Sequence, residues 1–189
     1  MSRSRTILTL SGSLREGSVN QLLIDAAVDL APVNYSFTHY RKTGLIPHFN
    51  AGLKDNIDEV IQFRKEIRKS DAILICTPEY AFGIPGTLKN ALDWLVSEGE
   101  LYQKAVAIIS ASPLATGGIH AFNDLERTLQ AQQAMMSESC KLQVPVIHIK
   151  MNAEGIISDE ELIKDLTNLW SGMEELIIQS EQIELPSRV

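Results

Sequence analysis

Residues 10–20 read Leu10-Ser11-Gly12-Ser13-Leu14-Arg15-Glu16-Gly17-Ser18-Val19-Asn20 and join a short apolar strand to an amphipathic helix. Serine and glycine let the backbone approach an anion closely, and an arginine can donate two parallel hydrogen bonds to phosphate oxygens. The unpaired N–H groups and the dipole of the following helix favour an anion at the same place. The segment therefore predicts a phosphate site. Because it matches neither G-x-x-x-x-G-K-[ST] nor G-x-G-x-x-G, we expect neither a triphosphate nor a dinucleotide pyrophosphate.

Outward from this segment, short apolar runs alternate with segments of helical periodicity. The predicted strands are 6–10, 35–40, 72–77, 105–109 and 144–149, and the proline at 145 favours a sheet edge for the last of them. The predicted helices are 18–31, 57–69, 87–96, 120–136 and 159–179, the first capped by Ser18 with Gln21 and the last by Ser158 with Glu161. Five strands alternating with five helices indicate an α/β fold, with a parallel sheet covered by helices on both faces.

In such a sheet, ligands bind beyond the carboxyl ends of the strands, where the strand order reverses. By analogy with flavodoxin, a standard example of this architecture, we expect the order 2-1-3-4-5, which places the crevice between the first and third strands. The loops that follow these two strands are Ser11–Ser18 and Pro78–Gly86, which are chemically the most distinctive segments of the chain. We therefore expect a flavodoxin-like fold whose ligand lies between these loops.

Composition narrows the class of protein further. The 189 residues suit a single domain spanning 1–189, and the net charge of −7 argues against nucleic acid or an acidic membrane as partner. Cys76 and Cys140 match no metal or redox spacing, and the four histidines are scattered, so no metal site is expected. The chain has no apolar run long enough for a signal peptide or a membrane span, so the expected location is the cytoplasm.

The second loop, Thr77-Pro78-Glu79-Tyr80-Ala81-Phe82-Gly83-Ile84-Pro85-Gly86, combines two prolines, two glycines and two aromatic residues at a strand end. Prolines and glycines define a fixed bend, and Tyr80 and Phe82 offer flat apolar surface to a planar ring system. The helix that follows contains Lys89-Asn90-Ala91 and Asp93-Trp94.

These motifs, together with Gly12-Ser13-Leu14-Arg15, Ser18 and Asn20, resemble the NADPH-dependent FMN reductase family over nearly the whole chain. That family comprises flavodoxin-like quinone, azo-dye and chromate reductases. The resemblance implies that the first loop holds the FMN phosphate, that the second loop borders the isoalloxazine ring, and that a third loop at Ser112 and Gly117 closes the site. The implied cofactor-binding residues are Ser11, Ser13, Leu14, Arg15, Ser18, Val19, Asn20, Pro78, Glu79, Tyr80, Ala81, Phe82, Gly83, Ser112 and Gly117. The family usually has asparagine where this chain has Ala81, so a contact made by that side chain would be lost.

The resemblance also implies an activity. NAD(P)H would pass a hydride through FMN to a small-molecule acceptor such as a quinone, azo compound, chromate or free flavin in a ping-pong cycle, in which no side chain acts as a catalytic residue. Relatives usually form homodimers or homotetramers, and the helix near Leu88–Val96 with the connection Thr43–Gly52 is a candidate contribution to a second subunit's site.

Other interpretations remain open at this point. A non-enzymatic FMN electron carrier or redox-sensing module would use the same loops. A hydrolase using Ser13 or Cys76 is disfavoured, because the chain has no G-x-S-x-G elbow. Each residue also has a purely structural interpretation. Arg15 could be an ordinary surface arginine, Tyr80 and Phe82 could pack within their loop, and Cys76 could be a small buried strand residue.

Overall fold

The computed structural model describes residues 3–53 and 57–183, so the ends of the predicted 1–189 domain lie outside the described residues. The strands are β1 (Arg5–Ser11), β2 (Tyr35–Tyr40), β3 (Ala72–Thr77), β4 (Ala105–Ala111) and β5 (Lys141–Val144). They form one sheet in the order β2-β1-β3-β4-β5, and every neighbouring pair is parallel. The predicted 2-1-3-4-5 order is therefore confirmed.

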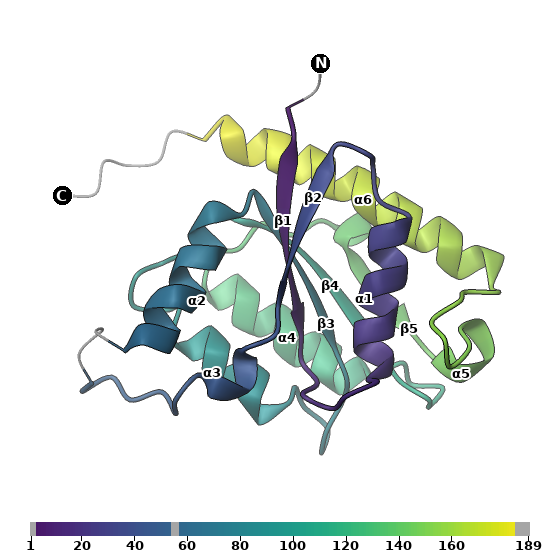
Figure 1. Ribbon diagram of the computed structural model, residues 1–189, viewed down its shortest axis with the longest axis horizontal. Helices are drawn as coiled ribbons and strands as arrows, with labels where there is room; N and C mark the ends of the chain where they lie inside the picture. Colours follow the sequence, from purple (N-terminus) through teal and green to yellow (C-terminus); the bar gives the residue numbers. More distant parts are fainter. Residues whose placement is uncertain (1–2, 54–56, 184–189) are drawn as a thin grey trace.

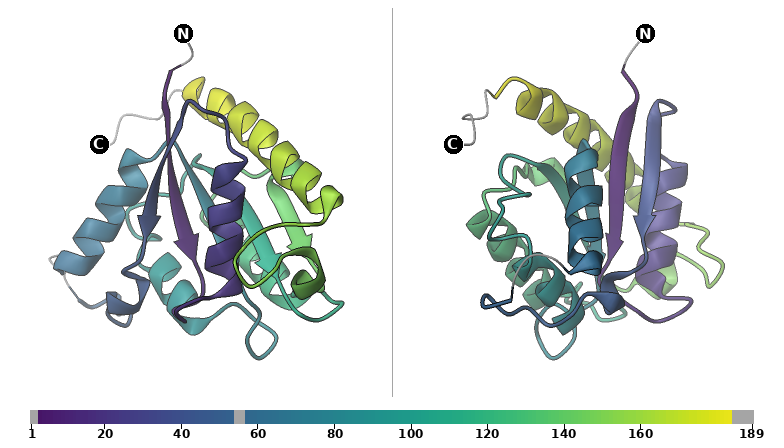
Figure 2. Two further views of the ribbon diagram at one scale, coloured as in Figure 1. Left: turned by 45° about the vertical axis from the view of Figure 1, so that its right-hand side comes forward. Right: turned by 60° about the vertical axis from the view of Figure 1, so that its left-hand side comes forward.

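Helices cover both faces of this sheet (Figures 1 and 2). They are α1 (Val19–Asp29), α2 (Asp58–Lys69), α3 (Gly86–Asp93), α4 (Ile119–Ala131), α5 (Ile147–Lys150) and α6 (Glu160–Glu181), with 3-10 helices η1 (Thr43–Leu45) and η2 (Glu138–Cys140). Helices α1 and α6 pack on one face, and α2, α3 and α4 pack on the other. This layering follows from the sequence, since each helix has an apolar stripe and the central strands are apolar except for Thr77 and Ser110.

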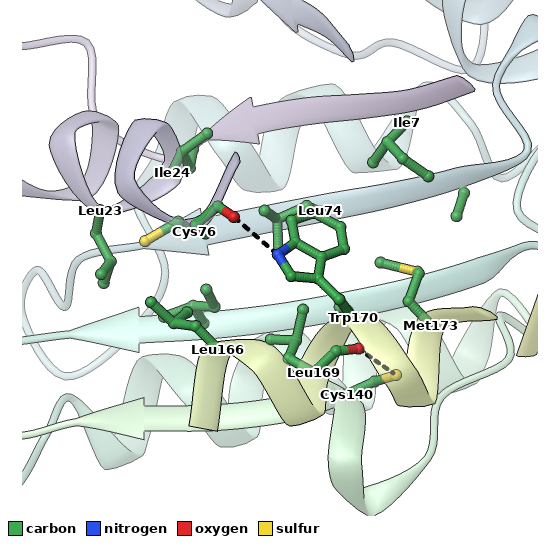
Figure 3. Close-up of a cluster of buried hydrophobic side chains, with 14 of the residues drawn as sticks. Ile7, Leu23, Ile24, Leu74, Cys76, Cys140, Leu166, Leu169, Trp170 and Met173 are labelled. Carbon is green, nitrogen blue, oxygen red and sulfur yellow. Dashed lines mark hydrogen bonds between the residues drawn. The ribbon is translucent and has the colours of Figure 1, made fainter. Parts of the chain in front are cut away.

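The central strands β3 and β4 are buried at every residue, as expected for strands covered on both sides. Under α6, the Trp170 ring lies among Ile7, Leu74 and Met173 (Figure 3). Its indole Nε1–H donates to the Ala27 carbonyl of α1 at 2.8 Å, which satisfies the one polar atom of this large buried side chain. Trp170 thus joins α6 to α1 across the core.

The prediction of a strand over 144–149 is wrong. Strand β5 ends at Val144, and the following residues turn into the short helix α5. Pro145 has no N–H to continue the ladder, and Val146 takes a left-handed conformation with φ of 49°, which reverses the chain. A short apolar run does not by itself distinguish a strand from a helix. The prediction that this segment forms an edge strand holds only for the residues before the proline.

Helix ends also differ from prediction. Helix α3 ends at Asp93 and not at Val96, and turns follow it. Helix α4 stops at Ala131, and Met135 instead pairs with Ala105, the first residue of β4. Helix α6 is capped by Asp159, whose carboxylate accepts from the Leu162 N–H at 2.7 Å, and not by Ser158. The Ser158 hydroxyl instead donates to the Lys150 carbonyl. Asp, like Ser, is a preferred capping residue, so the composition alone did not decide between the two neighbours.

Candidate functional site

The first βα loop, residues 11–18, is shaped by its own serine side chains. The Ser18 hydroxyl caps α1 by accepting from the Asn20 N–H at 3.3 Å, which confirms Ser18 as the cap. The predicted pairing with Gln21 is wrong, because the Gln21 side chain donates to Asp25 Oδ1 at 2.8 Å. The hydroxyls of Ser11 and Ser13 accept from the N–H groups of Ser13 and Arg15 at 3.2 and 3.3 Å. These local bonds curl the loop around the start of α1, at the carboxyl edge of the sheet (Figure 1).

Several amides in this loop are available to an anion. Among the hydrogen bonds of the described residues, none uses the N–H of Leu14, Glu16, Gly17 or Val19 as donor. These groups precede or begin α1, where the helix dipole favours negative charge, and the Arg15 side chain beside them is exposed. A phosphate monoester suits this combination of free amides, guanidinium and hydroxyls. The loop therefore fits the phosphate of a mononucleotide.

Gly12 lets this loop approach the end of β3. Its N–H donates to the Cys76 carbonyl at 2.8 Å, and a Cβ added there would lie 2.7 Å from the Thr77 Oγ1. Any larger residue would push the first loop away from the strand that begins the second loop. The close approach keeps the two predicted loops side by side.

The second loop carries a tight two-residue turn. Tyr80 and Gly83 exchange both backbone hydrogen bonds, at 3.0 and 3.1 Å, with Ala81 and Phe82 between them at φ values of 49° and 61°. The Tyr80 and Phe82 side chains are 54% and 76% exposed, although both are aromatic. The only ring against Phe82 among the described aromatic contacts is that of His120, 5.0 Å away. Exposed flat surface of this kind is available to a planar ligand.

Glu79 ties the second loop to α4. Its Oε2 accepts from the backbone N–H groups of His120 and Ala121 at 2.7 and 3.1 Å. These are the first amides of α4, which have no partner within the helix, and the helix itself provides no side-chain cap. Glu79 therefore acts as a cap supplied from another element, which fixes the position of the adjacent Tyr80 turn.

A groove of about 1060 Å³ opens at this edge of the sheet. Gly12, Leu14 and Arg15 line it from the first loop, and Tyr80 and Pro85 line it from the second. A smaller adjoining cavity of about 160 Å³ is lined by Ser11, Ser13 and Arg15, with Tyr40 and Arg41 on its other side. Arg15 and Leu14 border both spaces. The two loops singled out from the sequence thus meet at one site.

Other predicted site residues lie next to this site but do not line either space. Ser18 and Asn20 are buried, and the Asn20 Oδ1 lies 3.4 Å from the Cys76 Sγ, which acts as donor. Val19, the first residue of α1, is half-buried and packs against the hydrophobic core on that face of the sheet. The other predicted site residues that line neither the groove nor the smaller cavity are Pro78, Glu79, Ala81, Phe82, Gly83, Ser112 and Gly117.

The third loop is held by internal bonds. The Ser112 hydroxyl accepts from the Leu114 N–H at 3.1 Å, and the Gly117 carbonyl accepts from Ser110 at 2.7 Å. A Cβ on Gly118 would lie 3.6 Å from the Cβ of Glu79, so this loop packs behind the second one. The third loop therefore contacts the second loop at Glu79 but does not line the groove.

One wall of the groove comes from a segment that the sequence did not assign to this chain's own site. Residues 43–49 line the groove, together with Thr87, Lys89, Asn90 and Asp93 of α3. The segment contains Gly44, Pro47 and no helical or strand periodicity, so it was expected only as a long connection that contributes, with the helix near Leu88–Val96, to a second subunit's site. Asn90 of α3 and Trp94 directly after it link this segment to the site, because both form hydrogen bonds with residues 47–49.

Three observations on the described residues concern a nucleophile, a metal site and a membrane span. Burial raises the pKa of the Cys76 thiol well above its ordinary value, so Cys76 suits packing and not nucleophilic attack. Among the described residues, no three His, Cys, Asp or Glu side chains gather closely enough to hold a metal ion. Within the same residues, no helix combines the length and apolarity that crossing a bilayer requires.

The fold and the site together define a flavodoxin-like α/β protein whose first loop has amides without a hydrogen-bond acceptor among the described residues, with an exposed aromatic turn beside it. Residues 5–147 match the family model described as NADPH-dependent FMN reductase. The chain therefore belongs to the NADPH-dependent FMN reductase family, a family of oxidoreductases, as the resemblance of its motifs implied.

Individual relatives agree with this membership. A quinone reductase of Escherichia coli is 30% identical over 183 residues, which cover 94% of this chain and 97% of that protein. An NAD(P)H-dependent FMN reductase of Pseudomonas aeruginosa is 36% identical over 136 residues, covering 68% and 71% of the two chains. The solved structure of FerB, a flavoenzyme NAD(P)H:(acceptor) oxidoreductase from Paracoccus denitrificans, superposes with a TM-score of 0.83 at 28% identity, covering 93% and 98%.

Proposed function

We propose that this chain is an FMN-dependent NAD(P)H oxidoreductase that reduces a small-molecule acceptor, with quinones as the first class to test. The observation that carries the proposal is the meeting of Arg15 and Tyr80 at one groove, with the free amides of the first loop at its end. Family membership and the quinone reductase relative support the same activity.

Bound FMN would supply the hydride chemistry, accepting a hydride from NAD(P)H and delivering two electrons to the acceptor. The protein's part is binding and orientation. Arg15 and the amides of Leu14, Glu16, Gly17 and Val19 would neutralise and hold the phosphate. No side chain in the groove is assigned as a general acid or base, so we name no catalytic residue.

We propose two roles for the predicted site residues. Those that line the two spaces would contact FMN directly, namely Ser11, Ser13, Leu14, Arg15 and Tyr80. The backbone of Val19 and the exposed ring of Phe82 would contact it at the two ends of the site. The others would hold the loops in place, namely Ser18, Asn20, Pro78, Glu79, Ala81, Gly83, Ser112 and Gly117.

Because one groove serves the flavin edge, we propose that NAD(P)H and acceptor use it in turn, which gives ping-pong kinetics. Parallel lines in double-reciprocal plots with varied NADPH and quinone would support this order. Intersecting lines would show that both substrates bind at once and would exclude it.

We also propose that residues 1–189 form a single domain that works in the cytoplasm as a homodimer or homotetramer. Leu45, Phe49 and Leu53 are 64%, 40% and 46% exposed on the segment beside the groove, which suits contact with a second copy. Sedimentation equilibrium at working concentration is expected to give a multiple of the chain mass. A monomer mass would contradict this assembly.

The activity is tested on the purified protein. It is expected to be yellow after incubation with FMN and desalting, to bleach when NADPH is added without oxygen, and to regain colour with 1,4-benzoquinone. FMN binding without turnover of NADPH and quinone would point instead to an electron carrier. A protein that takes up no FMN would contradict the proposal altogether.

A further inference from the structure

The groove wall formed by residues 43–49 has little regular structure to hold it. Its backbone bonds are those of the short helix η1, from Leu45 to Lys42 at 2.9 Å and from Ile46 to Thr43 at 3.3 Å. Beyond Ile46, the backbone–backbone bonds of the described residues include none made by Pro47, His48 or Phe49. The part of the wall that carries Phe49 is therefore held by something other than its own backbone.

Helix α3 holds this wall through Asn90. The Asn90 Oδ1 accepts from the Phe49 N–H at 2.7 Å, and its Nδ2 donates to the carbonyls of Pro47 at 2.9 Å and Ile46 at 3.3 Å. A side-chain amide has two N–H donors and one carbonyl oxygen. Both kinds of atom are thus engaged by the wall, so Asn90 acts on the groove mainly through the segment that it holds.

Trp94 strengthens the same contact one helical turn later. Residues four apart share a helix face, and the Trp94 Nε1–H donates to the Pro47 carbonyl at 2.8 Å. The edge of one ring meets the face of the other between Phe49 and Trp94, with centroids 5.2 Å apart and planes at 86°. Because Trp94 is buried and Asn90 is half-buried, both form a fixed base under the wall.

The wall presents apolar side chains to the groove from its exposed side. Leu45 and Phe49 are 64% and 40% exposed, and both line the groove with Ile46 and Pro47. On the first-loop side, a Cβ on Gly44 would lie 2.9 Å from the Leu14 Cδ1, so the wall reaches the loop proposed to hold the phosphate. A shift of the wall would therefore change the shape of the groove that Tyr80 also lines.

We infer that Asn90 is a positioning residue, which with Trp94 holds the 43–49 wall and thereby determines how well a planar apolar acceptor binds. The inference rests on the proposed oxidoreductase function. It assigns no contact between Asn90 and the reacting atoms. It predicts that loss of the Asn90 amide impairs acceptor binding while leaving FMN binding at the first loop intact.

The test uses the FMN-loaded protein and two acceptors of different width, 1,4-benzoquinone and 2-methyl-1,4-naphthoquinone. Asn90→Ala is expected to raise the KM for both quinones by about tenfold, the effect of losing hydrogen bonds worth about 1–2 kcal/mol. The kcat, the Kd for FMN and the sedimentation mass are expected to stay within about twofold of the wild-type values. Asn123→Ala, at an exposed asparagine on α4, is the matched control and is expected to change none of these quantities.

Asn90→Asp provides a second, nearly isosteric readout if the alanine variant does not fold. A protonated carboxyl can donate to the Pro47 carbonyl, whereas an ionised one repels it. The ratio of this variant's quinone KM to the wild-type KM at the same pH is therefore expected to fall towards one as the pH is lowered. A purely structural role would change kcat and the Kd for FMN with the same pH dependence, whereas positioning of the wall changes the quinone KM alone.

Three outcomes would overturn the inference. In the first, both variants keep the wild-type quinone KM. In the second, KM, kcat, FMN affinity and mass all change together, which would mean that Asn90 supports the whole fold or the assembly. In the third, the wild-type protein binds FMN but turns over no quinone, which removes the proposed function and this inference with it.

Discussion

Ala81 occupies a backbone conformation that alanine adopts at a cost. It and Phe82 have positive φ between the paired residues Tyr80 and Gly83, as in a type I′ turn, which favours asparagine and glycine. The usual asparagine of the family at this position is thus explained by the turn itself. The exposed Ala81 side chain leaves the turn intact but makes it less stable.

Relieving this strain is expected to stabilise the protein. Ala81→Gly and Ala81→Asn should raise the free energy of unfolding by about 0.5–1 kcal/mol, because both residues tolerate positive φ better than alanine does. Urea denaturation followed by circular dichroism measures the change. Ala115→Gly, at an exposed loop position without positive φ, is the control and should be neutral or destabilising. Equal effects at 81 and 115 would rule out strain at Ala81.

At the residue scale, the sequence predicts the site residues that closely follow a strand end in the chain. Arg15, Ser13 and Tyr80 line the site because each lies directly after a strand end. It does not predict that Asn20 is buried against Cys76 or that Asn90 holds the segment near Phe49. Those contacts join residues far apart in the chain, and their geometry exists only once the sheet has formed.

At the scale of elements, α4 depends on a carboxylate from another loop. Glu79→Ala is expected to lower the free energy of unfolding by about 1–2 kcal/mol, since it leaves the amides of His120 and Ala121 without their acceptor. It should also weaken FMN binding, because the Tyr80 turn loses its anchor. Thermal unfolding and an FMN titration measure the two effects.

Glu79→Gln is the matched control for this prediction. Its amide oxygen can still accept from both N–H groups, so most of the stability and of the FMN affinity should remain. A glutamine variant as impaired as the alanine variant would show that the charge matters, and not the cap.

The start of α6 offers a second test at this scale. The Leu162 N–H and the Lys150 side chain hold the pKa of Asp159 below its ordinary value. A carboxylate with a lowered folded pKa stabilises the protein above the unfolded pKa of about 3.9, and this contribution is lost as pH falls through the folded value. Asp159→Ala should therefore lower the melting temperature at pH 7, and the difference from wild type should shrink below about pH 4.

Ser158→Ala is the control for the assignment of the cap. The Ser158 hydroxyl makes only a 3.4 Å bond to Lys150, so its loss should change the melting temperature less than the loss of Asp159. The reverse order would restore the cap expected from the sequence alone.

At the scale of the whole molecule, the alternation of apolar runs with helical stripes predicts the layered α/β fold. The strand order came from analogy with flavodoxin, since periodicity shows which segments are strands but not which of them pair. The error at Val144–Ile149 arose where an edge strand of four residues gives way to a turn, because a proline and a left-handed valine act over too short a range for periodicity to show. The groove was predicted from the two loops, but its third wall was not.

The central claim is that one singly phosphorylated ligand lies with its phosphate at the start of α1 and its ring beside the Tyr80 turn. The most direct measurement compares the Kd of FMN with that of riboflavin, which lacks the phosphate, in wild type and in Arg15→Ala. Arg127→Ala, an exposed arginine on α4 away from both spaces, is the control. We predict that wild type and the control bind FMN at least about tenfold more tightly than riboflavin, and that Arg15→Ala loses about tenfold in FMN affinity with little change for riboflavin. Equal affinities of wild type for FMN and riboflavin, or an Arg15→Ala variant with unchanged FMN affinity, would contradict the account.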